Sequence, residues 1–216
     1  MSTFASDLGP MVNETAPRQE SLVSTRDPRR YIGICSQTVG IGETASVPML
    51  ARISLIDYRG QTVYDVFVQP THSVTDYHHE TTGLDANHLA SGIPFQLVQE
   101  TVAQIIRGKI LVGYRIWLDL SVLGLQHPAV DTRDTALFLP LRRSIGSINE
   151  IPSLANLVGR FLRRRLGFGY QHPLEDARAA VDLFRSCEEQ WETYIEAGQW
   201  PCALPPYNLT GLHNRS

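Results

Sequence analysis

The sequence is poor in cysteine and has no long apolar run. Its three cysteines, Cys35, Cys187 and Cys202, are an odd number at wide spacing, which matches neither a disulfide framework nor a zinc-binding pattern. This usage is typical of a reducing compartment, so we expect an intracellular protein of the cytoplasm or nucleus. No stretch reaches the ~18 apolar residues that a membrane-spanning helix needs, and no secretory signal is visible, so we expect no membrane association.

Positive charge is also scarce. Nineteen lysines and arginines stand against 22 aspartates and glutamates, which gives a formal net charge of -3. A chain of this charge has no overall attraction for a phosphate backbone, although a local basic stripe can still provide one. RNA is therefore a possible but disfavoured partner on this ground. The composition carries no signal for an oligomeric state.

What is present suffices for one folded domain. The chain has 216 residues, of which 43% are hydrophobic and 19% charged, as in an ordinary soluble domain with a sizeable core. Residues 1–29 are polar and without periodicity, which predicts a disordered tail. We expect the domain over residues 30–195, followed by a proline-rich C-terminal tail over residues 196–216.

The order of strands and helices predicts a mixed α/β fold. A strand begins at Tyr31, and we expect Cys35, Ser36 and Gln37 at its end. Two β-branched apolar runs at 49–57 and 61–68 are separated by Tyr58-Arg59-Gly60, which is typical of a hairpin. The hydrophobic spacing then predicts further elements: helices at 94–107, 116–125, 152–166 and from Pro173, and strands at 109–114 and near 129–138. Three antiparallel strands followed by alternating helices and strands indicate helices packed on a mixed sheet.

Several motifs in this order resemble those of a known enzyme superfamily. They are "ARISLID", "VYDVFVQPTHSVTDY", "TTGL", "ILVGY", "DTRDT" and "EDARAAVDLF", and they span roughly residues 31–192. Together they resemble the small 3′-to-5′ exonucleases of the DEDDh superfamily, in the branch of RNA exonuclease 4 and the interferon-stimulated exonuclease. The resemblance implies a ribonuclease H-like mixed sheet, in which three antiparallel strands precede parallel ones, and a cleft at the carboxyl ends of the central strands.

The resemblance also implies four carboxylates that hold two magnesium ions about 4 Å apart across the scissile phosphate, assisted by a histidine. In this chain Cys35 and Gln37 stand where the first two acids are usual. Asp119 and Asp176 match the other two.

The family histidine is also altered. Five residues before Asp176, where the family has a histidine, this chain has Gln171, with His172 displaced by one. Tyr114 also replaces a histidine that is usual after the "ILVG" strand.

This substitution pattern predicts a failed metal site. Two magnesium ions bring four positive charges, whereas Asp119 and Asp176 offer only two negative ones. The thiol of Cys35 is a soft ligand that suits magnesium poorly, and Gln37 adds only a neutral carbonyl. We therefore expect no metal, no cofactor and no magnesium-dependent exonuclease activity.

The altered cleft admits three functions. The first is a small organic ligand with metal-free acid–base chemistry of an isomerase, cyclase or lyase type. The second is a catalytically dead pseudonuclease that binds RNA or a protein partner, and the third is weak residual 3′-to-5′ exoribonuclease activity with a single ion. We favour the first, because the charge disfavours polyanions and the substitutions extend to the cleft wall. Its residues are three catalytic groups, Asp119, Asp176 and His172, and five substrate-binding ones, Cys35, Gln37, Tyr114, Trp117 and Gln171.

Some of these residues also have purely structural explanations. Asp176 lies in the first turn of a predicted helix, where acids are favoured by the helix dipole. His172 is either a neighbour of the helix cap or a displaced base. Cys35 is a small buried hydrophobe in the simpler interpretation, because no activating base is assignable beside it.

Overall fold

The computed structural model describes residues 27–167 and 169–206, and its centre is one mixed sheet of seven strands. Six strands follow the order β5-β3-β2-β1-β6-β7, and β4 pairs with β1. β2 runs antiparallel to both of its neighbours, β1 and β3, whereas β6 runs parallel to both β1 and β7. The predicted fold class is confirmed. The strands are β1 (Tyr31–Ile41), β2 (Val47–Asp57), β3 (Thr62–Gln69), β4 (Val74–Asp76), β5 (Ile93–Pro94), β6 (Ile110–Gly113) and β7 (Thr132–Asp134).

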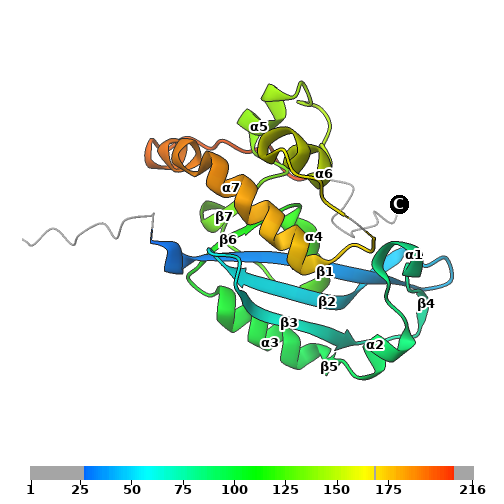
Figure 1. Cartoon of the computed structure of the whole chain (residues 1–216). Coiled ribbons are helices and arrows are strands. Elements are labelled where there is room, and N and C mark those ends of the chain that lie inside the picture. Colours follow the sequence, from blue (N-terminus) through cyan, green and yellow to red (C-terminus); the bar gives the residue numbers. More distant parts are fainter. Residues whose placement is uncertain (1–26, 168, 207–216) are drawn as a thin grey trace, which may run out of the picture.

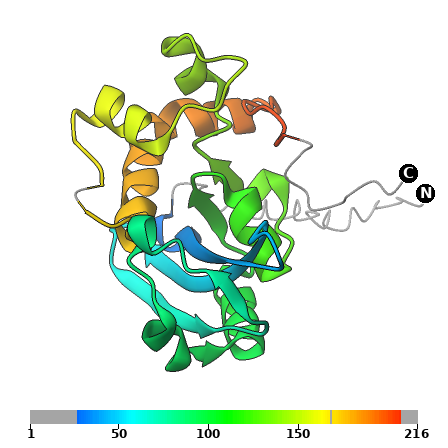
Figure 2. The ribbon, with the colours of Figure 1, turned by 90° about the vertical axis from the view of Figure 1, so that its right-hand side faces the viewer.

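Helices cover both faces of this sheet (Figure 1). Alternation along the strands explains why both faces are apolar: Ile32 and Ile34 of β1 pack with α3 and α4, whereas Tyr31 packs with α7 on the other face. The turned view of Figure 2 shows α7 passing over β1 and β2. The helices are α1 (His79–Thr82), α2 (Ala86–Ala90), α3 (Phe95–Ile106), α4 (Ile116–Leu123), α5 (Leu139–Ser144), α6 (Leu154–Leu157) and α7 (Pro173–Glu196).

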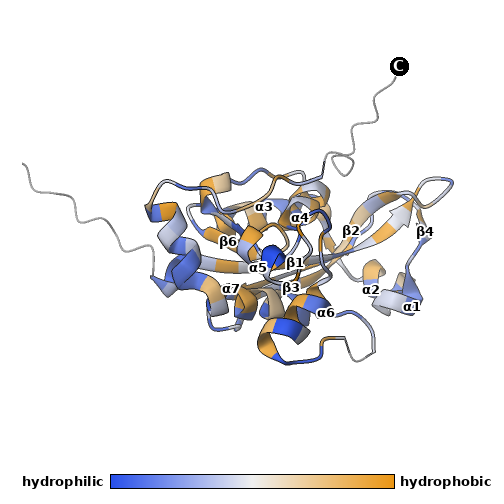
Figure 3. Ribbon diagram, turned by 90° about the horizontal axis from the view of Figure 1, so that it is seen from above, coloured by the Kyte–Doolittle hydropathy of each residue, from blue (hydrophilic) through white to orange (hydrophobic). Residues whose placement is uncertain are grey.

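The last helix has the predicted start and the predicted apolar face. Pro173 occupies its first turn, where its missing N–H costs nothing, and His172 is the N-cap residue. Ala177, Val181 and Phe184 are fully buried against the sheet. Hydrophilic and hydrophobic colours alternate along the covering helices in Figure 3, as expected for helices that bury one face.

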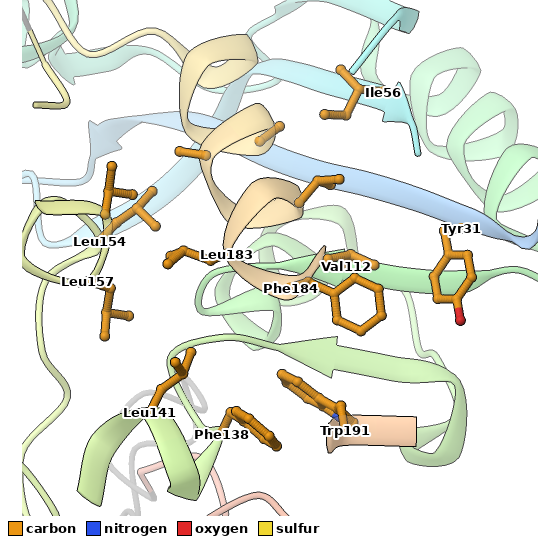
Figure 4. Close-up of a cluster of buried hydrophobic side chains, with 14 of the residues drawn as sticks. Tyr31, Ile56, Val112, Phe138, Leu141, Leu154, Leu157, Leu183, Phe184 and Trp191 are labelled. Atoms are coloured by element: carbon orange, nitrogen blue, oxygen red, sulfur yellow. The ribbon is translucent and has the colours of Figure 1, made fainter. Parts of the chain in front are cut away.

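Aromatic rings fill the space between α7 and the end of the sheet (Figure 4). Trp191 stacks on Phe138 with ring centroids 4.0 Å apart, and its edge meets Phe184 at 5.7 Å. Next to this cluster Arg133 donates two hydrogen bonds to the Glu192 carboxylate, and both side chains are almost completely buried. Such a pair is tolerated in a core because each charge is matched.

Two local predictions need correction. Cys35, Ser36 and Gln37 do not end the first strand, because β1 pairs with β2 from Ile32 to Ile41. The helix expected at 152–166 is shorter: α6 passes into a π-helical turn over Val158–Leu162 and ends at Arg163, whose φ of 51° is left-handed.

The ends of the chain are described only in part. Residues 1–26, which are most of the predicted N-terminal tail, and residues 207–216, the last ten of the predicted C-terminal tail, lie outside the described residues. The segment before Pro205 lies alongside the start of α5. The Leu139 backbone N–H donates a hydrogen bond to the Pro201 carbonyl, and the Ala203 N–H donates one to the Leu137 carbonyl. No helix within 27–167 and 169–206 is long and apolar enough to cross a bilayer.

Candidate functional site

A cavity of about 600 Å³ opens where β6 ends beside β1. Only residues 31–34 of β1 pair with β6, so Cys35 is the first residue beyond the parallel neighbour and lies on the cavity wall. The N-terminal end of α7 forms another wall, over β1 (Figures 1 and 2). Five of the eight predicted site residues line this cavity: Cys35, Tyr114, Gln171, His172 and Asp176.

Asp119 lies behind the wall and does not line the cavity. Its side chain is buried, and its Oδ1 accepts hydrogen bonds from the Ser36 backbone N–H at 2.9 Å and the Ser36 hydroxyl at 2.5 Å. Burial raises the pKa of Asp119 to about 7, and the two Ser36 hydrogen bonds oppose this increase. A carboxyl in this environment is partly protonated near neutral pH.

Asp176 is more accessible. It lies in the first turn of α7 and lines the cavity, and burial together with the neighbouring Glu175 raises its pKa to about 6. Burial also raises the pKa of the Cys35 thiol well above its ordinary value, and the charges of Asp119 and Asp176 add to that increase. Cys35 is therefore a neutral thiol and a poor ligand or nucleophile.

Gln37 has a structural role that the sequence did not reveal. Its side-chain amide donates a 2.6 Å hydrogen bond to the backbone carbonyl of Gln171, and so joins β1 to the segment that precedes α7. Gln171 itself donates a backbone hydrogen bond to Thr81, so this segment is held between β1 and α1. The Gln37 side chain is buried and is absent from the cavity wall.

His172 is held as the cap of α7. Its Nδ1 accepts the Leu174 backbone N–H at 3.3 Å, and its pKa is lowered chiefly by burial and then by the nearby charge of Arg52. Arg52 is in turn paired with Asp65 at 2.7 Å. His172 therefore caps the helix and also lines the cavity, so its position agrees with a capping role and with that of a displaced base.

The two aromatic residues predicted for the cleft lie apart. Tyr114 lines the cavity, and its hydroxyl donates a 2.8 Å hydrogen bond to the Pro152 carbonyl, which joins the end of β6 to the segment before α6. Trp117 instead lines a separate apolar cavity of about 230 Å³ together with Trp200. The structure therefore does not bring Trp117 to the site.

Arg115 lines the cavity and was not among the predicted residues. It directly follows Tyr114 with φ 60° and ψ 42°, a left-handed conformation that favours glycine. Its backbone N–H and that of Ile116 both donate to the carboxylate of Asp134, at 3.0 and 2.7 Å. A single arginine after a buried strand belongs to no sequence motif that would mark it as a binding residue. Its place on the cavity wall is therefore visible only in the folded chain.

The donor set for a metal is small. Over the described parts of the chain, no three side chains of histidine, cysteine, aspartate or glutamate gather in a group that could hold a metal ion. At the two positions where the family has its first carboxylates, Cys35 carries a neutral thiol and Gln37 an amide already engaged with Gln171.

Comparison with known proteins gives a consistent result. No family model matches the chain. RNA exonuclease 4 of Mycosarcoma maydis is 38% identical over 174 residues, which cover 80% of this chain and 46% of that protein. RNA exonuclease 4 of Debaryomyces hansenii is 35% identical over 173 residues, covering 80% of this chain and 63% of that protein. The chain thus spans about half the length of the curated relatives it matches.

Solved structures share the fold. The Pan2 catalytic unit of Neurospora crassa superposes with a TM-score of 0.64 at 18% identity, over 89% of this chain and 32% of that one. The Saccharomyces cerevisiae Pan2 exonuclease module in complex with AAUUAA RNA superposes with a TM-score of 0.66 at 20% identity, over 80% of this chain and 31% of that one.

These relatives overturn two expectations. The small-molecule ligand favoured from the sequence, with its metal-free chemistry, is wrong, because the relatives that cover most of this chain are RNA exonucleases. The view that the net charge disfavours RNA is wrong for the same reason. Net charge averages over the whole surface, whereas phosphate binding depends on the few cations that face the cleft. From its motifs, its relatives and its sheet, the chain belongs to the DEDDh exonuclease superfamily, among relatives of RNA exonuclease 4.

Proposed function

We propose that this chain binds the 3′-terminal part of an RNA strand in the cavity beside Cys35 and does not cut it by two-metal hydrolysis. The observation that carries the RNA part is the 38% identity to an RNA exonuclease 4 over 80% of the chain. The cavity supports it by position, because it lies at the carboxyl end of β6, where ligands of α/β sheets bind. Its volume of about 600 Å³ accommodates a nucleotide-sized group.

The loss of hydrolysis is supported by the ligands that remain. Two divalent cations require several anionic oxygens, but the wall offers the Asp176 carboxyl, while Asp119 is buried and bonded to Ser36. The thiol of Cys35 and the amide of Gln37 do not compensate for the missing charge. The side chains present do not fit a pair of magnesium ions.

The test uses the full chain and a 5′-labelled single-stranded RNA. We expect binding that weakens steeply with salt, because phosphate contacts release counterions, and no shortening of the RNA with Mg²⁺, Mn²⁺ or EDTA. Absence of binding at low salt would remove the RNA proposal. Stepwise shortening that requires Mg²⁺ and is abolished by Asp176→Asn would show that hydrolysis is retained.

A second candidate is slow exonuclease activity with one ion. It is favoured by the nearness of two carboxyl groups to Cys35. The charges of Asp119 and Asp176 both raise the pKa of its thiol, so both carboxyls lie close to this residue. The same RNA assay separates the two candidates, since only this one predicts products that disappear with EDTA. We also propose an intracellular setting, supported by three cysteines that are all free thiols.

A further inference from the structure

We propose that the guanidinium of Arg115 is the phosphate-binding group of this cavity, so that RNA is held by an arginine and not through metal ions. The inference rests on the proposed RNA binding. It names the residue that supplies the positive charge and the phosphodiester group that it contacts. RNA binding should accordingly persist in EDTA and depend on Arg115.

The position of Arg115 is set by the backbone. With φ 60° it turns the chain sharply between β6 and α4, and the Asp134 carboxylate holds that turn through the N–H groups of Arg115 and Ile116. A left-handed residue that is not glycine is uncommon and persists only where the surroundings hold it. A glycine would make this turn more easily, so an arginine here points to a use for its side chain.

Within the described part of the chain no carboxylate pairs with the guanidinium of Arg115, which lies 5.9 Å from the centroid of the Tyr114 ring on the same cavity wall. Among the described residues no ion pair involves Arg115, and its buried Nε atom has no hydrogen-bond partner. By contrast, Arg52 and Arg133 are paired with Asp65 and Glu192. The acid beside Arg115, Asp134, is already engaged by three backbone N–H groups, from Arg115, Ile116 and Ala136.

The other charged side chains of the cavity wall are mostly acidic, so a phosphate needs the positive charge of Arg115 to bind there. Three acids line the cavity, namely Glu80, Glu175 and Asp176, and they would repel a phosphodiester. Of the described residues that line it, Arg115 is the one arginine, and none is a lysine. A planar guanidinium can donate two parallel hydrogen bonds to one phosphate.

The test compares RNA affinity in EDTA over a range of salt for four forms of the full chain. Arg115→Gly removes the guanidinium at a position whose backbone favours glycine, so folding should be retained and the thermal midpoint should not fall. Arg115→Lys keeps the charge without the bidentate geometry. Arg107→Gln is the matched control, because Arg107 is exposed at the end of α3, on the other face of the sheet, and its loss changes the net charge equally.

We expect Arg115→Gly to weaken binding roughly tenfold and to reduce the slope of log affinity against log salt by about 0.7, the value for one phosphate contact on a single strand. Arg115→Lys should lie between Arg115→Gly and the unaltered protein, and Arg107→Gln should remain within about twofold of the unaltered protein. Binding by Arg115→Gly that equals the unaltered protein in affinity and slope would overturn the role of Arg115 and leave the proposed function intact. Failure of the unaltered protein to bind RNA would overturn both.

Discussion

Ser36 donates two hydrogen bonds to a single oxygen of Asp119, one from its backbone N–H and one from its hydroxyl. This contact joins β1 to α4 and leaves the Asp119 carboxyl buried and internally satisfied.

Stability should depend on pH through Asp119. Its pKa in the folded chain is about 7, whereas an aspartate in the unfolded chain has a pKa near 3.9. The folded state therefore binds more protons between these values, and the free energy of unfolding should fall as pH rises from about 4 to about 7, by on the order of 1 kcal/mol per pH unit at most. Urea unfolding over this range should show the decline, and Asp119→Asn should make it shallower, while Asp134 and Asp176, whose pKa values burial raises to about 7 and about 6, contribute the rest. The exposed Glu150→Gln is the control, and a decline unchanged by Asp119→Asn would contradict the assignment.

Acids introduced at positions 35 and 37 should create a metal site. In Cys35→Asp combined with Gln37→Glu, two further carboxylates would join Asp119 and Asp176, which approaches the charge that two divalent ions need. We expect Mn²⁺ to raise the thermal midpoint of this double variant and EDTA to reverse the effect. Cys35→Asn serves as the uncharged control. A double variant whose midpoint ignores Mn²⁺ would show that the charge deficit is not what limits metal binding.

Gln37→Ala should loosen the segment before α7. This substitution removes the 2.6 Å hydrogen bond to the Gln171 carbonyl. Trypsin should then cleave faster at Arg163, Arg164 and Arg165, which precede that segment, because local opening exposes the backbone. Gln99→Ala is a matched control, since Gln99 makes a similar 2.6 Å bond to the Leu123 carbonyl beneath the other face. Equal cleavage of both variants would rule out a special role for Gln37.

The buried pair Arg133–Glu192 should be costly to break. Glu192→Ala leaves an uncompensated guanidinium in the core, so we expect a loss of about 3–5 kcal/mol in the free energy of unfolding. Arg164→Ala, which removes a pair with Asp182 on the exposed surface, should cost less than about 1 kcal/mol. Chemical denaturation measures both. The double variant Arg133→Met with Glu192→Leu should recover most of the stability that Glu192→Ala loses, because it buries no charge. If it recovers none, the two side chains contribute through their packing and not through their charges.

Much of the site was visible as residue identities in the sequence. The motifs placed Cys35, Gln37, Asp119 and Asp176 at the family positions. Three of the eight predicted site residues nevertheless do not line the cavity, and their side-chain directions explain why. Asp119 is turned to Ser36, Gln37 to Gln171, and Trp117 to the apolar cavity beside Trp200.

Helix and strand positions followed the hydrophobic periodicity closely, because α3, α4 and α7 bury one regular apolar face each. Periodicity did not reveal that β1 continues through Cys35–Gln37 to Ile41. That extension depends on pairing with β2, which follows after residues 42–46, whereas the polar residues 36–38 interrupt the apolar alternation that marks a strand in the sequence.

The sequence by itself determined the family, because this depends on which residue types occupy which motif positions, and it predicts that acids are missing at Cys35 and Gln37. Only the tertiary structure decided which groups face the cavity. The left-handed turn at Arg115 is held by Asp134 of β7, and it sets where α4 begins and how the helix is rotated. As a result Arg115 lines the cavity, whereas Trp117 lines the separate apolar cavity. A contact between the turn before α4 and the end of β7 has no local signature in the chain, which is why this arrangement appears only on folding.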